Sequence, residues 1–370
     1  MDLELYFSQL EELVNIESCS DDPEGLNKVA AFFSGRFRDL GWQVQEYDLA
    51  PQSGTCVICT NRKAEHYDVL LIGHLDTVFP KGTGRPYSVE GDRCYGAGVA
   101  DMKGGSLLMY HLMKDLPKEI NEKLNIVAVF NPDEEIGSRY SKEYYIPYAA
   151  KSKLALAYEA RSTKGGICIE RKGAVQYKLQ FKGIPGHCGF VFKNGAKSAI
   201  SEMARWIVAL DALQSAQRDT SVNVGLASGG SKPNVVAEHA EITVDIRFSD
   251  PTEAERVEET VAQLLKQAEQ RGIGVEIAEK RCKLPLVPDE KAKAYFDHVM
   301  NIGKAAGLNF ICEARGGLSD ANIIAQYGPV CIDGMGPAGG SGHCPDEYML
   351  SDTVLPAYDL SMLIFKDLAK

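Results

Sequence analysis

The stretch Leu70–Pro80, LLIGHLDTVFP, holds the feature around which the rest of the chain is interpreted. An apolar run ends here at Gly73, which is typical of a buried parallel strand. If the backbone stays extended, His74 and Asp76 project to the same side, because side chains repeat every second residue. An imidazole beside a carboxylate at the carboxyl end of a strand suits a metal ligand with its orienting acid. Taken alone, the pair is more typical of a core histidine beside a solvated aspartate.

Two further apolar segments end in acidic groups. The run Leu124–Phe130 leads into a turn that carries the adjacent residues Glu134 and Glu135, and Leu154–Tyr158 ends at Glu159. Either group alone is typical of a solvated acidic loop. In open α/β sheets, however, functional sites gather at the carboxyl ends of strands. Three such endings in one domain therefore favour a functional site.

Two loop residues extend this set. Asp101 follows the long polar, glycine-rich stretch Pro80–Gly98 and precedes a predicted helix over Ser106–Leu116. A carboxylate is favoured ahead of a helix N-terminus, so an ordinary helix cap is the simplest alternative. His343 lies in a glycine-rich turn near the C-terminus, where no packing pattern accounts for an imidazole. Both are candidates for the same site.

Composition excludes several classes of protein. The 370 residues, with 45% hydrophobic and 25% charged side chains, are typical of an ordinary globular protein large enough for two domains. A net charge of −11 argues against nucleic acid or an anionic membrane as a partner. We find no signal peptide and no membrane-spanning run, and ten scattered cysteines indicate reduced thiols in the cytoplasm. A redox or zinc role for Cys56 and Cys59 is less favoured, because no second cysteine pair accompanies them.

The middle of the chain is predicted to form a separate domain. Between residues 173 and 283 the predicted elements follow the order β-α-β-β-α-β, which is typical of a ferredoxin-like α+β sandwich. The segments 1–172 and 284–370 have α/β character and carry all the candidates described above. We therefore predict an α/β protein with a metal-binding catalytic domain, a central mixed sheet flanked by helices, and an inserted α+β domain.

The candidate side chains form a nitrogen and oxygen ligand set without thiolates. Such a set suits zinc, with cobalt or manganese as substitutes. The set supplies two metal ions if one carboxylate bridges them, and two close metals can share and activate a water. Glu134, which is adjacent to the candidate ligand Glu135, would then act as general base. The five candidate ligands are His74, Asp101, Glu135, Glu159 and His343.

The ordered motifs GHLDTV, GAGVADMKGG, NPDEEIGS, YEA, GIPGHCG and SGHCPDE resemble the dinuclear-zinc exopeptidase and amidohydrolase family. This family includes glutamate carboxypeptidase, acetylornithine deacetylase, succinyl-diaminopimelate desuccinylase, peptidase T and aminoacylase-1, and the glutamate carboxypeptidase branch looks most similar. The resemblance covers nearly the whole chain, including the place of the inserted domain. It implies a zinc-exopeptidase-like fold whose inserted domain is a lid and forms homodimers.

The resemblance also implies roles for the ligand candidates. One zinc would be held by His74, Asp101 and Glu159. The other would be held by Asp101, Glu135 and His343, so that Asp101 bridges the two. Asp76 would orient His74, and Glu134 would take the proton from the bridging water and pass it to the leaving amine. The Asp101–Met102 peptide bond would be cis.

Other residues are implied in substrate binding. His187 resembles a histidine that stabilises the oxyanion and that the partner subunit supplies in dimeric members. Asn234 and Arg247 resemble the pair that binds the substrate carboxylate, although a cross-strand salt bridge is a competing role for Arg247. The chain departs from the carboxypeptidase pattern after Glu159 and again at Gly316, Gly317 and Ser319, which we expect to form a turn lining the substrate pocket.

We therefore predict a cytoplasmic dizinc enzyme that hydrolyses an amide bond in a small peptide or N-acyl amino acid with a free carboxylate. An aminopeptidase of the tripeptidase type uses the same chemistry and differs in requiring a free α-amine. A metal-free binding protein that kept the fold would be expected to have lost ligands or the base. A cysteine hydrolase using Cys188 or Cys344 beside its histidine is disfavoured, because adjacent side chains rarely point at each other.

Overall fold

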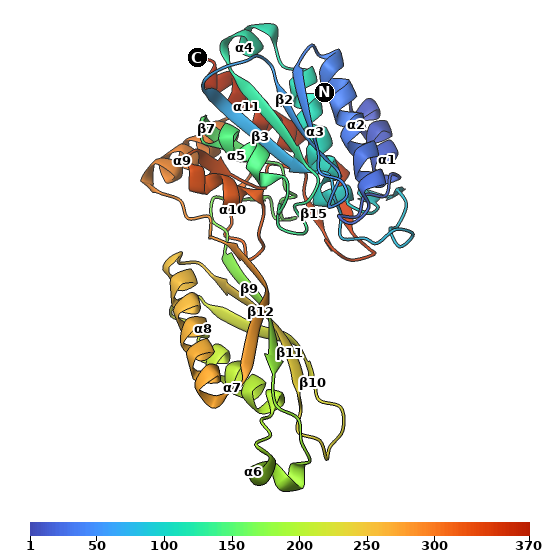
Figure 1. The fold of residues 1–370 in the computed structure, drawn as a ribbon. Helices are drawn as coiled ribbons and strands as arrows, with labels where there is room; N and C mark the ends of the chain where they lie inside the picture. The colour runs from blue at the N-terminus through green and yellow to red at the C-terminus, as the bar shows by residue number, and fades with distance from the viewer. The chain divides into compact units, whose positions relative to one another are not determined.

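The computed structural model describes residues 1–370, which form two compact units (Figure 1). The first unit contains Met1–Glu170, Pro288–Arg315 and Ser319–Lys370. The second unit contains Arg171–Val287 together with Gly316–Leu318. The second unit is thus inserted into the chain of the first.

A mixed sheet forms the centre of the first unit. Its six strands have the order β1-β2-β6-β3-β7-β14. The neighbours β6, β3, β7 and β14 are parallel, whereas β1 and β2 are antiparallel to their neighbours. The carboxyl ends of β6, β3 and β7 therefore meet at one edge of the sheet. The strands are β1 (Gln43–Asp48), β2 (Thr55–Thr60), β3 (Tyr67–His74), β6 (Ile126–Asn131), β7 (Ser152–Ala157) and β14 (Val330–Ile332).

Helices and short strands complete the first unit. None of the helices combines the length and the apolar character needed to span a bilayer. The helices are α1 (Leu3–Val14), α2 (Pro23–Asp39), α3 (Gly104–Lys114), α4 (Lys118–Lys123), α5 (Lys142–Ala149), α9 (Glu290–Ala305), α10 (Asp320–Ile324) and α11 (Val354–Leu368). The short strands are β4 (Ser88–Glu90), β5 (Arg93–Tyr95), β15 (Gly339–Gly340) and β16 (Tyr348–Leu350) in one sheet, and β8 (Gly166–Ile167) with β13 (Ile311–Cys312) in another.

The apolar run of β3 is buried on both faces of the sheet. Val69 and Leu71 belong to a core cluster that also contains residues of α1, α2, α3 and α11. Leu70 and Ile72 are equally buried but lie outside that cluster, on the opposite face. There α5 contacts β3 and β7. This burial explains why the strand reads as a continuous apolar run rather than as an alternating one.

Glycines allow α3 to approach the carboxyl end of the sheet closely. A Cβ on Gly105 would lie 1.9 Å from the carbonyl oxygen of Tyr158, so only glycine fits at this position. Gly98 has a φ of 73°, in the left-handed region that favours glycine. It precedes the helical turn Val99–Lys103, which leads into α3. Asp101, within that turn, is thereby brought beside the ends of β3 and β7.

The second unit is an antiparallel sheet with two long helices on one face. Its chain order, β-α-β-β-α-β, is the predicted one, and the predicted fold class is confirmed. The unit extends beyond the expected range 173–283, because Arg171 and residues up to Val287 join it. Its core lies between the sheet and the helices α7 and α8. The strands, in the order β10-β11-β9-β12, are β9 (Gly173–Lys182), β10 (Ser221–Gly229), β11 (His239–Phe248) and β12 (Gly274–Lys283), and the helices are α6 (Val191–Asn194), α7 (Ala199–Asp211) and α8 (Thr252–Arg271).

The cysteines form no disulfides. All ten are free, and Cys56 and Cys59 are both buried in β2. Residues three apart on a strand point to opposite faces. These two thiols are therefore packed on different sides of the sheet and do not face a common ligand.

Candidate metal centre

His74 is the last residue of β3, and only 2% of it is exposed. Its Nδ1 lies 2.9 Å from the backbone carbonyl oxygen of Asp76, and its Nε2 lies 3.0 Å from Oδ1 of Asp101. When Nδ1 carries the proton, it donates to the carbonyl and leaves the Nε2 lone pair directed at Asp101. The carboxylate of Asp76, expected to orient this ring, lies 3.4 Å from Nδ1. The main chain of Asp76 thus makes the shorter contact.

The Asp76 carboxylate holds the turn that carries the two glutamates. It is fully buried and accepts hydrogen bonds from the backbone N–H groups of Glu134, at 3.1 Å, and Glu135, at 3.0 Å. The hydroxyl of Ser20 donates to the same carboxylate at 2.7 Å. A buried carboxylate requires such donors to offset its desolvation. Asp76 therefore connects the ends of β3 and β6 as well as contacting His74.

A second buried carboxylate contacts residues at both ends of the same turn. Asp320 accepts hydrogen bonds from Asn131 Nδ2 at 2.5 Å, from the hydroxyl of Tyr145 at 3.0 Å and from the hydroxyl of Ser138. No sequence pattern indicates Ser20 or Asp320 as a site residue. Both contact residues far away in sequence, so local spacing carries no signal for them.

Asp101 lies between two imidazoles. Its Oδ1 faces Nε2 of His74, and its Oδ2 lies 3.2 Å from Nε2 of His343. Burial raises the pKa of Asp101, but hydrogen bonds with His343 and His74 outweigh burial and hold that pKa well below its usual value. The peptide bond between Asp101 and Met102 is cis, as the family resemblance implied. Each oxygen of this one carboxylate thus serves a different histidine.

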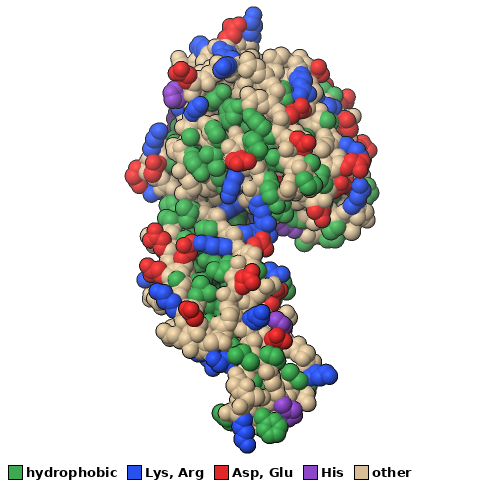
Figure 2. Space-filling model, viewed as in Figure 1, with side chains coloured by type: hydrophobic (Ala, Val, Ile, Leu, Met, Phe, Trp, Pro, Cys, Tyr) green, Lys and Arg blue, Asp and Glu red, His purple; other side chains and the backbone are tan.

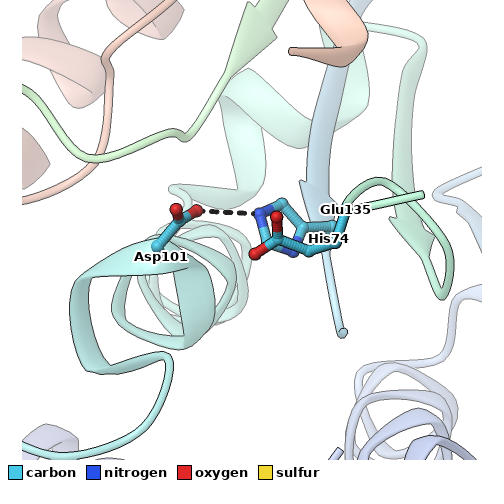
Figure 3. A group of neighbouring side chains, drawn as sticks. All are labelled: His74, Asp101 and Glu135. Atoms are coloured by element: carbon cyan, nitrogen blue, oxygen red, sulfur yellow. Dashed lines mark hydrogen bonds and ion pairs between the residues drawn. The ribbon is translucent and has the colours of Figure 1, made fainter. Parts of the chain in front are cut away.

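The remaining candidates complete two groups around Asp101. Oε2 of Glu135 lies 3.3 Å from Nε2 of His343, and Oε1 of Glu159, which follows β7, lies 3.9 Å from Nε2 of His74. Figure 3 shows Asp101 facing His74 and Glu135 across a short gap. One ligand atom from each of these three side chains lies within 4.8 Å of the other two.

The donor set fits a divalent cation. Two imidazoles and three carboxylates converge without a thiolate, which is the ligand chemistry of zinc.

Burial raises the pKa of Glu135 to about 7 and that of Glu159 well above its usual value. Hydrogen bonds with Asp101 and Glu135 raise the pKa of His343 to about 11. Burial lowers the pKa of His74, but hydrogen bonds with Asp101 and Asp76 outweigh burial and raise it. The neighbouring carboxylates thus favour positively charged groups in the site, here the protonated forms of the two histidines.

Glu134 lies beside this cluster without belonging to either group. Its backbone N–H is held by Asp76, and its side chain is half-buried. Its negative charge is one of the causes that raise the pKa of Glu159, so the two carboxylates lie near each other. A half-buried carboxylate beside the ligand cluster is a candidate for a general base.

His187 and Asn234 lie together at one end of the second unit. His187 is exposed, and its Nδ1 accepts a hydrogen bond from the N–H of Gly189 at 3.2 Å. The N–H of Cys188 donates to the carbonyl oxygen of Asn234 at 3.1 Å, and His187 pairs with Val235 in a β-bridge. The turn that carries His187 is thus tied to the loop that carries Asn234.

Arg247 lies toward the opposite end of β11 from Asn234. Its guanidinium makes a two-pronged ion pair with Asp245, at 2.6 and 2.9 Å. Asn234 precedes β11, and the strand rise alone between His239 and Arg247 is roughly 27 Å. The structure therefore does not bring Asn234 and Arg247 together within one chain. The expected salt bridge of Arg247 exists, but along its own strand rather than across strands.

The predicted turn at residues 316–319 has mixed surroundings. Gly316 and Gly317 are exposed, and Arg171 Nη1 donates to the carbonyl oxygen of Gly317 at 3.1 Å. Ser319 is fully buried, caps the N-terminus of α10 and donates from its hydroxyl to Asp333 at 2.6 Å. This geometry favours a structural role for the Ser319 hydroxyl. That Gly316 and Gly317 line the substrate pocket stays a prediction.

We predict that Asp76→Asn destabilises the first unit even without metal. The amide places a donor where the carboxylate accepts an N–H, and leaving such a group unpaired costs about 1–3 kcal/mol. The control Ser20→Ala removes one of three donors and places no donor against an N–H, so its loss should be smaller than that of Asp76→Asn. Trp42 lies in the first unit and Trp206 in the second, so a Trp206→Phe background lets Trp42 fluorescence follow urea unfolding of the first unit. Equal losses in the two variants would contradict the role assigned to Asp76.

Comparisons with known proteins agree on one family. The model of peptidase family M20/M25/M40 matches residues 70–366. Carboxypeptidase G2 of Pseudomonas sp. (strain RS-16) is 26% identical over 353 residues, which are 94% of this chain and 85% of that protein. A succinyl-diaminopimelate desuccinylase of Stenotrophomonas maltophilia (strain K279a) is 25% identical over 77% of this chain and 79% of its own.

Solved structures share the fold. A tripeptidase from Staphylococcus aureus has a TM-score of 0.79 at 21% identity, covering 100% of this chain and 99% of its own. An M20 family metallo-carboxypeptidase from Sulfolobus solfataricus has a TM-score of 0.74 at 17% identity, covering both chains fully. The tripeptidase likeness shows the fold alone and does not favour the aminopeptidase alternative. The resemblance inferred from the motifs is confirmed: the chain belongs to peptidase family M20/M25/M40 and is a metal-dependent hydrolase of amide bonds.

Proposed function

We propose that this hydrolase binds two zinc ions and releases a C-terminal amino acid from a small peptide, or an acyl group from an N-acyl amino acid. The observation that carries the proposal is Asp101, whose two oxygens face two different imidazoles, at 3.0 and 3.2 Å. His74, Asp101 and Glu159 would hold one ion, and Asp101, Glu135 and His343 the other. Cobalt or manganese would be substitutes. Two such ions, when bound, activate a water and polarise the scissile carbonyl.

In this proposal the proton is carried by Glu134. One of its carboxylate oxygens takes a proton from the attacking water and later delivers it to the nitrogen of the leaving amine. The backbone of Glu134 is fixed by Asp76, while no candidate metal group requires its side chain. Glu135, on the same turn, would be a ligand. The adjacent glutamates thus divide the roles of base and ligand.

The substrate is proposed to carry a free carboxylate. The relatives include a carboxypeptidase and a desuccinylase, and the guanidinium of Arg247 offers the planar fork that binds a carboxylate with two hydrogen bonds. Asp245 already pairs with the guanidinium of Arg247, so a substrate carboxylate would either displace Asp245 or bind the guanidinium beside it.

Ten free cysteines support a reducing, cytoplasmic location.

A homodimer through the second unit is part of the proposal. Asn234 and Arg247 lie at opposite ends of β11, so they can bind one carboxylate only if two chains contribute. The end that carries His187 also exposes apolar side chains, with Ile184 at 44%, Phe190 at 57% and Phe192 fully exposed. Figure 2 shows hydrophobic side chains at the end of the unit where α6 lies. Such exposed groups support a contact with another surface, where His187 would stabilise the oxyanion of the partner's site.

We predict a division of labour between the two glutamates. Glu134→Gln should retain two metal ions per chain and lose at least ~10²-fold in kcat, the usual worth of general acid–base catalysis. Glu135→Gln should lose metal. Elemental analysis of the purified variants, with activity measured on dipeptides and N-acyl amino acids, provides the test. Equal metal loss in both variants, or full activity of the chelator-treated enzyme, would contradict the proposal.

We also predict that His187 acts in catalysis from a second chain. His187→Ala should lower kcat by roughly 10²–10³-fold without metal loss, the cost of removing one oxyanion donor. Mixed with inactive Glu134→Gln protein, it should regain activity, because a mixed dimer contains one site with both groups intact. His239→Ala, at another exposed histidine of the same unit, is the matched control and should keep its activity. No recovery despite demonstrated subunit exchange would exclude the two-chain arrangement.

A further inference from the structure

Glu347 is a buried carboxylate that the proposed mechanism does not use. Only 1% of this residue is exposed. Its Oε1 accepts hydrogen bonds from the backbone N–H groups of Ala100, at 2.9 Å, and Asp101, at 3.0 Å. Its Oε2 accepts one from the N–H of Gly98 at 3.1 Å. Three main-chain donors around the proposed bridging ligand thus converge on one side chain.

The backbone conformation of this loop explains the convergence. Gly98 is left-handed, and Asp101 is not helical, with φ of −114° and ψ of 86°. The N–H of Val99 donates to the carbonyl oxygen of Gly96 at 3.1 Å, whereas the N–H groups of Gly98, Ala100 and Asp101 point to one place, as backbone N–H groups do in a concave anion site. Here the chain fills that concavity with its own carboxylate. The position of the Asp101 backbone therefore depends on Glu347.

Glu347 also belongs to the loop that carries His343. Its N–H donates to the carbonyl oxygen of Cys344 at 3.0 Å, and the N–H of Cys344 donates to that of Ser341 at 3.0 Å. Immediately after Glu347 the chain enters β16, which pairs with β5. One side chain thus ties the turn that holds His343 to the loop that holds Asp101.

The two proposed metal positions depend on this link to different degrees. His74 ends β3 and Glu159 follows β7, so both are supported by the central sheet. Glu135 is held through its N–H by Asp76. His343, by contrast, has a φ of 65° and a side chain that is 58% exposed, on a turn outside the sheet. Its distance to Asp101 is set by the loops that Glu347 joins.

We infer that Glu347 is a positioning residue that sets the metal affinity of one position selectively, the one formed by Asp101, Glu135 and His343. The inference rests on the proposed function, in which two ions bind. Residues that orient metal ligands typically contribute 10- to 100-fold to affinity. The position formed by His74, Asp101 and Glu159 keeps two sheet-supported ligands and is affected less.

The test is a titration of the full-length, metal-free enzyme with Zn²⁺ in competition with a chromophoric chelator. Wild type should show two sites per chain. In Glu347→Ala the affinity of one site should fall roughly 10- to 100-fold while the other changes only a few-fold. Glu347→Gln should recover part of the loss, because its remaining oxygen still accepts from Ala100 and Asp101. Glu253→Gln is the matched control, since Glu253 is a buried carboxylate of the second unit that accepts from Thr220 at 2.7 Å.

The outcomes separate the inference from the proposed function. Fewer than two sites in wild type would overturn the proposed function itself. Two sites in wild type with unchanged affinities in Glu347→Ala, or an equal loss at both sites, would overturn the role of Glu347 alone. If Glu347→Ala does not fold, Glu347→Gln decides by the same criteria. A loss of equal size in Glu253→Gln would show a general effect of stability and overturn the selective role.

Discussion

A buried carboxylate, that of Asp76, sets the geometry on which the candidate site depends. An unpaired carboxylate at this depth would cost several kcal/mol, so its surroundings must supply donors. Three are present: the N–H groups of Glu134 and Glu135 and the hydroxyl of Ser20. Its main-chain carbonyl also orients the ring of His74. One residue thereby connects two proposed ligands, His74 and Glu135, with the proposed base, Glu134.

The remainder of the site is built by two different kinds of support. The strands β3, β6 and β7 bring their carboxyl ends together, because neighbouring strands that run parallel end at the same edge of the sheet. Close packing of Gly105 against Tyr158 brings the start of α3 to the same edge. The loops around Asp101 and His343 lack that support and are instead joined through Glu347. This difference predicts that the site has a rigid half and a more easily disturbed half.

Local patterns in the sequence predict the buried strands and most of the candidate site. The apolar run before His74 and the acidic endings after Phe130 and Tyr158 predict buried strands and the edge at which the candidate site lies, and alternating segments after Gly173 indicate the inserted domain. Local patterns carry no signal for contacts made across large sequence separations. Asp320 holds Ser138 across 182 residues, and Glu347 holds Asp101 across 246. Spacing along the chain says nothing of such pairs. The family resemblance pairs Asn234 with Arg247 by role and says nothing of their distance, and in the structure Asn234 precedes β11 while Arg247 lies toward its far end.

The most direct test of the account is a crystal structure of the zinc-loaded enzyme with anomalous diffraction measured at the zinc edge. The account predicts two zinc peaks per chain, roughly 3.5–4 Å apart, each in contact with a different oxygen of Asp101. His74 and Glu159 should contact one peak, and Glu135 and His343 the other. A single peak, or two peaks that do not share Asp101, would contradict the bridged site.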